Sequence, residues 1–221
     1  SKRLYFVNHD ASRGESVEVF DVGEHYKLGH VASVRSAAFK YAFMLNDVVE
    51  GGSSEELYVS QWLPFGFPAK GTESGEERWR KRLMFALAGV LRLRLTRVFR
   101  CDIAGECVGS SERFVGANGL AISDDRSTLY VADPLAKTVT ALARDPATGE
   151  LSKKAVIPTK HVVDNLEMAT DGTLMCGTIP LPFTAPDACK LGIGASATVG
   201  GQNVGCGASP GTLLLIKGGE Q

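Results

Sequence analysis

A repeated strand pattern is the sequence feature that most restricts the folds open to this chain. Four short β-rich segments each end in small or polar residues: LYFVNH from Leu4, LYVSQW from Leu57, LYVADP from Leu129 and LMCGTI from Leu174. Their first residues are 53, 72 and 45 residues apart. A period near 45 residues is typical of the four-stranded blades of a β-propeller. The sequence therefore predicts an all-β propeller with about four blade units.

A second pattern precedes three of the four segments. An asparagine, Asn46, Asn118 or Asn165, comes nine to eleven residues before the segment, with turn-forming residues between the two. These turns read Gly51-Gly52-Ser53-Ser54, Ser123-Asp124-Asp125-Arg126 and Asp171-Gly172. Each unit is therefore interpreted as a strand that begins just after asparagine, a tight turn and a return strand.

The longest step between units contains a helical pattern. Within EERWRKRLMFALAGVLRLRL, Trp79, Leu83, Leu87 and Leu91 recur every four residues behind a basic turn. This predicts a helical insert at about residues 75–95 that is too short and too charged to span a bilayer. Two alternatives remain open for it. The helix packs over one face of the propeller, or its residues 78–91 lie on a membrane or lipoprotein surface with the basic turn at the headgroups.

Composition adds only broad limits. The 221 residues are 44% hydrophobic and 22% charged, with a formal net charge of −1, which suits a globular chain of about one domain. The near-zero net charge gives no reason to expect a nucleic acid as partner. Residues 181–210 form a Gly-rich segment of low complexity, and no signal peptide is recognisable at Ser1.

The five cysteines do not settle the redox compartment. No C-x-x-C spacing is present, so a structural zinc site is not expected. Cys176 lies in an apolar strand pattern and is expected in the core. The other four leave their pairing open, since either neighbouring pair could form a disulfide in a secreted protein: Cys101, Cys107, Cys189 and Cys206.

The three asparagines indicate a metal site. The first strand of each blade lines the central channel, so Asn46, Asn118 and Asn165 are expected to converge at one face. Asp47 and Asp164 lie beside two of them. Calcium takes six to eight oxygen ligands, among them asparagine carbonyl oxygens. The alternative is that each asparagine caps a turn through its own backbone, but three asparagines at one register favour the metal.

His9 is the candidate general base. Its segment aligns with the return strand of a unit, and LYFV within it predicts a buried strand. A return strand ends at the face where the first strands begin, which places His9 beside the asparagines. A neutral imidazole there could accept a proton from water. The alternative is an ordinary surface or core histidine.

Taken together, these motifs resemble the serum paraoxonase/arylesterase family. The resemblance runs from Leu4 to about Pro180 through LYFVNHD, VEVFDV, LNDV, FVGANGLAISDDRSTLYVADPLAKTVTAL and VDNLEMATDGTL. It implies a six-bladed propeller, so that residues 1–221 would form one incomplete domain without its N- and C-terminal blades. It further implies two calcium ions, hydrolysis of lactones, aryl esters and some phosphotriesters, and secretion or membrane association.

The resemblance also assigns roles to individual residues. Four match ligands of the catalytic calcium: Asn46, Asn118, Asp164 and Asn165. Asp47 matches a ligand of the structural calcium, and His9 matches the second histidine of a proposed pair beside the catalytic ion. The segment VSQW departs from the family pattern, since Gln61 and Trp62 do not match.

Two other functions remain alternatives. ANGLAIS also occurs in gluconolactonases, so the chain could be a gluconolactonase-like propeller hydrolase with one metal that does not need His9. It could also be a catalytically inactive propeller fragment that acts as a binding module. An acyl-enzyme mechanism has no support, because neither a G-x-S-x-G motif nor a nucleophilic cysteine signature is present.

Overall fold

The computed structural model consists mainly of antiparallel strands. It describes residues 2–10, 12–41, 44–63, 76, 79, 83, 87, 90–159, 161–179, 197–199, 202–204 and 213–216. Within these residues, none of the helical stretches has the length and apolarity needed to cross a membrane.

The first sheet has three strands in the order β1-β2-β3. Its strands are β1 (Lys2–Asp10), β2 (Gly14–Val22) and β3 (Leu28–Val34), with short 3-10 turns at η1 (Glu24–Tyr26) and η2 (Ala37–Tyr41). Val17, Val19 and Val34 are fully buried. The prediction that LYFV forms a buried strand is wrong for one of its two faces, because Leu4 is 37% and Phe6 45% exposed. β1 is the edge strand of its sheet, and Tyr5 and Val7, which alternate with Leu4 and Phe6, pack against the buried core.

The second and third sheets are four-stranded meanders, each in simple sequence order. The second comprises β4 (Leu45–Glu50), β5 (Glu56–Gln61), β6 (Val98–Asp102) and β7 (Cys107–Gly109). The third comprises β8 (Leu120–Ile122), β9 (Thr128–Asp133), β10 (Thr138–Arg144) and β11 (Leu151–Pro158). Four antiparallel strands joined by short turns are the unit of a propeller blade.

The fourth sheet has the order β12-β13-β16. Its strands are β12 (Val162–Met168), β13 (Leu174–Ile179) and β16 (Leu213–Ile216), and a separate hairpin pairs β14 (Ala197–Val199) with β15 (Gln202–Val204). The predicted asparagine units are the hairpins β4–β5, β8–β9 and β12–β13, all of which are antiparallel.

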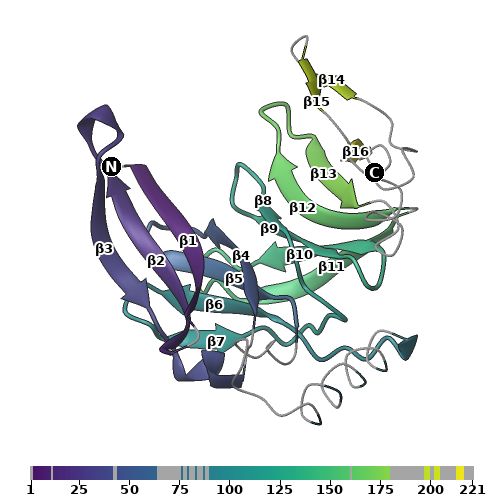
Figure 1. The fold of residues 1–221 in the computed structure, drawn as a ribbon, viewed down its shortest axis with the longest axis horizontal. Coiled ribbons are helices and arrows are strands. Elements are labelled where there is room, and N and C mark those ends of the chain that lie inside the picture. Colours follow the sequence, from purple (N-terminus) through teal and green to yellow (C-terminus); the bar gives the residue numbers. More distant parts are fainter. Residues whose placement is uncertain are drawn as a thin grey trace.

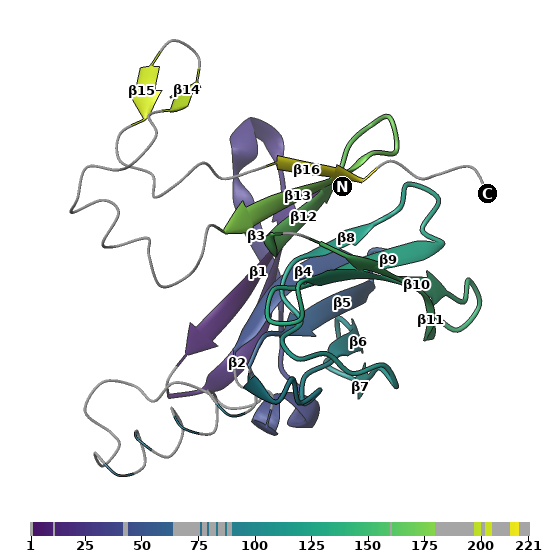
Figure 2. The same cartoon turned by 90° about the vertical axis from the view of Figure 1, so that its right-hand side faces the viewer.

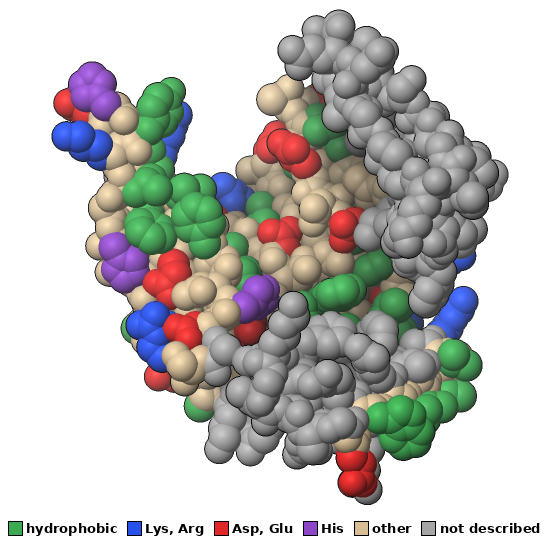
Figure 3. Space-filling model, viewed as in Figure 1, with side chains coloured by type: hydrophobic (Ala, Val, Ile, Leu, Met, Phe, Trp, Pro, Cys, Tyr) green, Lys and Arg blue, Asp and Glu red, His purple; other side chains and the backbone are tan. Residues whose placement is uncertain are grey.

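The main sheets succeed one another along an arc, as Figures 1 and 2 show. Among the described residues, the core consists of three apolar clusters, each between two successive sheets. Leu45 and Leu57 pack with β2 residues in the first, Tyr58 packs with Leu129 in the second, and Ala132 packs with Val163 in the third. Figure 3 shows a hollow between the first and the fourth sheet. The predicted all-β propeller class is therefore confirmed.

The predicted insert falls mostly outside the described residues. Residues 76, 79, 83, 87 and 90 have α-helical backbone, and the Leu91 N–H donates to the Leu87 carbonyl oxygen at 2.8 Å. Trp79, Leu83 and Leu87 are exposed. A continuous helix at 75–95, and its role at a membrane or lipoprotein surface, stay predictions, as does the single incomplete domain over residues 1–221. Most of the low-complexity segment 181–210 also lies outside the described residues.

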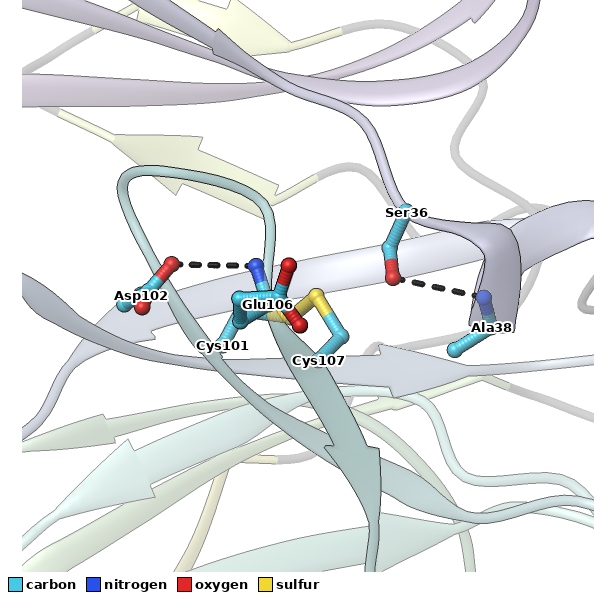
Figure 4. The surroundings of a disulfide bond; sticks show 6 residues. All are labelled: Ser36, Ala38, Cys101, Asp102, Glu106 and Cys107. Atoms are coloured by element: carbon cyan, nitrogen blue, oxygen red, sulfur yellow. Dashed lines mark hydrogen bonds between the residues drawn. A yellow bond between two sulfur atoms is a disulfide. The ribbon is translucent and has the colours of Figure 1, made fainter.

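A disulfide joins Cys101 to Cys107, a choice that the sequence left open. The two residues face each other across β6 and β7, and Figure 4 shows Asp102 accepting the Glu106 N–H in the intervening turn, at 3.0 Å. Cys176 is buried with a free thiol, as expected. Cys189 and Cys206 lie outside the described residues.

Candidate functional site

The predicted ligand residues lie on the first strands of three successive sheets. Asn46 and Asp47 belong to β4, Asp164 and Asn165 belong to β12, and Asn118 stands two residues before β8. In Figure 3, acidic side chains are spaced around the hollow between the first and fourth sheets. The residues of the sequence repeat therefore lie in, or just before, the first strand of each of three sheets.

The residues of β4 and β12 occupy β-bulges. The pairing of β4 with β5 is irregular between Leu45 and Val48, and the pairing of β12 with β13 is irregular between Val163 and Leu166. A bulge frees residues from the ladder and re-aims their side chains. Both Asn–Asp pairs lie inside these irregular stretches. Their side chains therefore need not alternate between the two faces of the sheet as in a regular strand.

Hydrogen bonds connect the three blades at this point. The Asn118 side chain bonds the Asp164 carboxylate, and the Gly119 N–H donates to the Asp164 carbonyl oxygen at 3.1 Å. Asp47 Oδ2 accepts the Leu120 N–H at 2.7 Å. The structure thus brings Asp47, Asn118 and Asp164 together. Asn46 is half-buried and Asn165 is exposed, and within the described residues neither side chain has a hydrogen bond to the other three.

Asn118 has one polar atom without a partner. The residue is 4% exposed, and its Oδ1 accepts no hydrogen bond from the described residues. A buried acceptor without a partner costs about 1–3 kcal/mol. Such an atom calls for an explanation, and an ion at the site is one of the few available.

The electrostatics of the two carboxylates also favour a cation. Burial raises the pKa of Asp47, backbone hydrogen bonds from Leu120 and Val48 oppose the rise, and the Asp164 carboxylate adds to it. Burial raises the pKa of Asp164 too, opposed by the hydrogen bond from Asn118. Two neighbouring carboxylates repel each other when both are ionised, and a cation between them would relieve that repulsion.

The donor atoms of the candidate ligands are all oxygens, and this chemistry determines which metals they suit. No cluster of three or more His, Cys, Asp or Glu side chains suited to a metal occurs in the described part of the chain. The residues that the structure brings together instead supply two carboxylates and the amide oxygen of Asn118, a hard donor set that suits calcium better than the softer transition metals. The residues present therefore fit calcium.

Ser60 is a site residue that the sequence analysis missed. Its Oγ donates to the Asn118 carbonyl oxygen at 2.5 Å and accepts the Asp47 N–H at 3.0 Å. It lies in VSQW, the segment where the family resemblance failed. The neighbouring Gln61 Nε2 donates to the Leu63 carbonyl oxygen at 3.0 Å. The only sequence feature that could have pointed to Ser60 was its small hydroxyl side chain near the end of a return strand.

His9 lies at the end of β1, beside the start of β4. Its Nδ1 is 2.8 Å from Glu15 Oε2, and the Leu45 N–H donates to the same oxygen at 2.9 Å. The imidazole therefore lies next to the residue that precedes Asn46. Its side chain is 50% exposed and that of Glu15 is 13% exposed. Sequence analysis missed Glu15, although a tight β1–β2 hairpin would have set it opposite His9.

A separate cavity of about 750 Å³ lies at the other ends of the strands. Its lining includes Glu56, Arg100, Arg126 and Arg144 from the second and third sheets. Arg144 Nη2 and Glu56 Oε2 form an ion pair at 2.5 Å within it. None of the predicted site residues lines this cavity. The cavity is therefore separate from the candidate site.

The fold is that of a β-propeller, and the candidate site lies where the first strands of its blades carry carboxylate and amide side chains. Residues 66–179 match the protein family described as SMP-30/Gluconolactonase/LRE-like region. The match spans just over half of the chain, and the chain belongs to this family. The propeller class expected from the paraoxonase resemblance is thus right, whereas membership of the paraoxonase/arylesterase family itself has no support from this match. No curated protein sequence matches the chain.

Three solved structures are similar to this chain to different degrees. A gluconolactonase from Xanthomonas campestris has a TM-score of 0.50 and 17% identity, with 95% of this chain and 60% of that chain covered. A luciferin-regenerating enzyme has a TM-score of 0.48 and 14% identity, covering 81% and 57%. The periplasmic gluconolactonase PpgL from Pseudomonas aeruginosa has a TM-score of 0.39 and 15% identity, covering 98% and 70%. The similarity to the Xanthomonas campestris gluconolactonase shows the fold alone. This chain spans about three fifths of the length of that protein.

Proposed function

We propose that this chain belongs to a calcium-dependent hydrolase of lactones, of the gluconolactonase type. The observation that carries the proposal is the buried, unpartnered Oδ1 of Asn118, between two blades that also supply Asp47 and Asp164. Family membership supports the substrate class. The relatives with solved structures include two gluconolactonases, which are described by that activity.

The proposed metal ligands come from three blades. Asp47, Asn118 and Asp164 would hold the ion, with Asn46 and Asn165 completing the oxygen shell from the same two bulges. When bound, calcium would polarise the carbonyl oxygen of the substrate. Ser60 would keep Asp47 and Asn118 in register, because it bonds the backbone of both.

His9 is proposed as the general base. It would take a proton from the water whose oxygen attacks the lactone carbonyl carbon, and the ring C–O bond then breaks as the departing oxygen is protonated. Hydrolysis of aryl esters, as in paraoxonases, is a second candidate, and the place of His9 beside the start of β4 favours it. The gluconolactonase-like alternative does not require His9, so lactone hydrolysis that survives His9→Gln would remove His9 from the mechanism and leave the metal site as proposed.

Calcium titration with Asn118→Ala tests the metal. The ion should stabilise the fold by about 2.7 kcal/mol at a hundredfold excess over its dissociation constant. Asn118→Ala should lose most of this shift in thermal unfolding. Asn8→Ala is the control, because the Asn8 side chain bonds Glu18 within the first sheet and is not a proposed ligand, and it should keep the shift.

Hydrolysis tests the reaction class. An aldonolactone and phenyl acetate are the two probes, each measured with calcium and with a chelator. Calcium-dependent hydrolysis of the lactone supports the proposal, and faster hydrolysis of the ester would favour the second candidate. Calcium binding without hydrolysis of either probe, or no calcium binding at all, would leave the chain as a binding module and overturn the proposal.

A further inference from the structure

We infer that Glu15 is a positioning residue that holds the imidazole of His9 in one tautomer, with Nδ1 protonated and Nε2 carrying the lone pair. The inference deepens the proposed function and rests on it, since it concerns the residue proposed there as base. Glu15 was not singled out by the sequence and has no role in holding the metal.

The placement of Glu15 follows from the β1–β2 hairpin. Glu15 is the second residue of β2 and pairs directly with His9, the second-last residue of β1. Its side chain is 13% exposed, so its carboxylate is largely covered, whereas the His9 side chain remains 50% exposed. A largely covered acceptor beside a half-exposed ring can direct one nitrogen and leave the other open to solvent.

The chemistry of the acceptor assigns the proton. An ionised carboxylate accepts hydrogen bonds and donates none. Glu15 Oε2 already accepts the Leu45 N–H at 2.9 Å and lies 2.8 Å from His9 Nδ1. Nδ1 must therefore carry a proton, and in the neutral ring the lone pair resides on Nε2. A carboxylate that orients a histidine base in this way is a recurring arrangement in hydrolases.

The same oxygen also ties His9 to the candidate metal strand. Leu45 is the first residue of β4, and Asn46 and Asp47 follow it in the bulge. Through its two hydrogen bonds Glu15 joins the β1–β2 hairpin to the start of that strand. It thereby sets where the ring of His9 lies relative to the residues proposed to bind calcium.

Nitrogen NMR of the His9 ring at neutral pH tests the inference without any assay of activity. In the 221-residue chain, Nδ1 should give the shift of a protonated ring nitrogen and Nε2 that of an unprotonated one. Glu15→Ala should return His9 to the Nε2–H tautomer that free histidine prefers. Glu15→Gln should keep the Nδ1–H tautomer, because its amide oxygen can still accept. Glu18→Ala is the control, since Glu18 bonds His30 in the same sheet, and it should leave His9 unchanged.

Kinetics then separates positioning from general stability. If the chain hydrolyses a lactone, Glu15→Ala should lower kcat about tenfold or more with little change in KM, a part of the contribution of a general base. When Glu15→Ala is added to the His9→Gln variant, kcat should not fall further. An equal loss in both backgrounds would overturn the inference. So would an Nε2–H tautomer in the unaltered chain, a result that stands even if Glu15→Ala fails to fold. Absence of hydrolysis would overturn the proposed function alone.

Discussion

Gly119→Ala perturbs a close contact between the segment just before β8 and strand β12. The Gly119 N–H donates to the Asp164 carbonyl oxygen at 3.1 Å, and its own carbonyl accepts the Ala132 N–H at 2.9 Å. A β-carbon at residue 119 would lie 2.6 Å from Asn165 Cα and 2.8 Å from Leu166 N. These are backbone atoms, which cannot rotate away as a flexible side chain could, so β12 would have to move.

The size of the effect follows from these contacts. Forcing one extra carbon into a packed interior costs about 1–3 kcal/mol. The hydrogen bond to Asp164 would weaken as β12 moves, at about 1 kcal/mol. We therefore expect Gly119→Ala to lose about 2–4 kcal/mol of stability, and its melting temperature to fall by about 5–15 °C for a chain of this length. Because Asn118 and Asp164 would separate, the calcium response should also fall.

Thermal and urea unfolding, each with and without calcium, measure both effects. Gly29→Ala is the matched control: Gly29 lies in β3, and a β-carbon there meets no atom within 4 Å, so this change should be close to neutral. Equal stability of Gly119→Ala and Gly29→Ala would refute the reasoning. A destabilised Gly119→Ala with an unchanged calcium response would refute the link between this contact and the metal site.

Two further predictions concern the first and second sheets. Burial would raise the pKa of Glu18, but hydrogen bonds, foremost from Ser33 and His30, lower it to about 2 from an ordinary value of 4.5. The stability that Glu18 contributes is therefore present above about pH 4.5 and is lost as the pH falls toward 2. Glu18→Gln should flatten this acid limb in unfolding measured from pH 2 to 6, and an unchanged limb would contradict the assignment. Opening the Cys101–Cys107 disulfide, which closes a short loop with a sequence separation of 6, should cost about 2 kcal/mol in urea unfolding. Identical midpoints under oxidising and reducing conditions would speak against it.

Local chemistry explains why much of the fold was predictable. Alternating apolar residues and turn-forming residues lie close together in the sequence, and they predicted the hairpins β4–β5, β8–β9 and β12–β13. The spacing of these hairpins predicted the propeller class. Exposure of Leu4 and Phe6 was not predictable in this way, because it depends on whether another strand covers that face of β1.

For the candidate site too, some features could be predicted from the sequence and others depend on the tertiary structure. The sequence alone predicted that Asn46, Asn118 and Asn165 share one position in successive units, because similar units repeat the same fold. The structure places Asn46 second in β4, Asn118 two residues before β8 and Asn165 fourth in β12. Only the tertiary structure decided that Asp47, Asn118 and Asp164 connect, that Ser60 bonds two of them, and that Glu15 joins His9 to the start of β4. The bulges in β4 and β12 shift the register locally. The contact of Ser60 with Asn118 and that of Glu15 with Leu45 join residues 58 and 30 positions apart. Long-range contacts of this kind follow from how blades pack against one another, and a local pattern carries no signal for them.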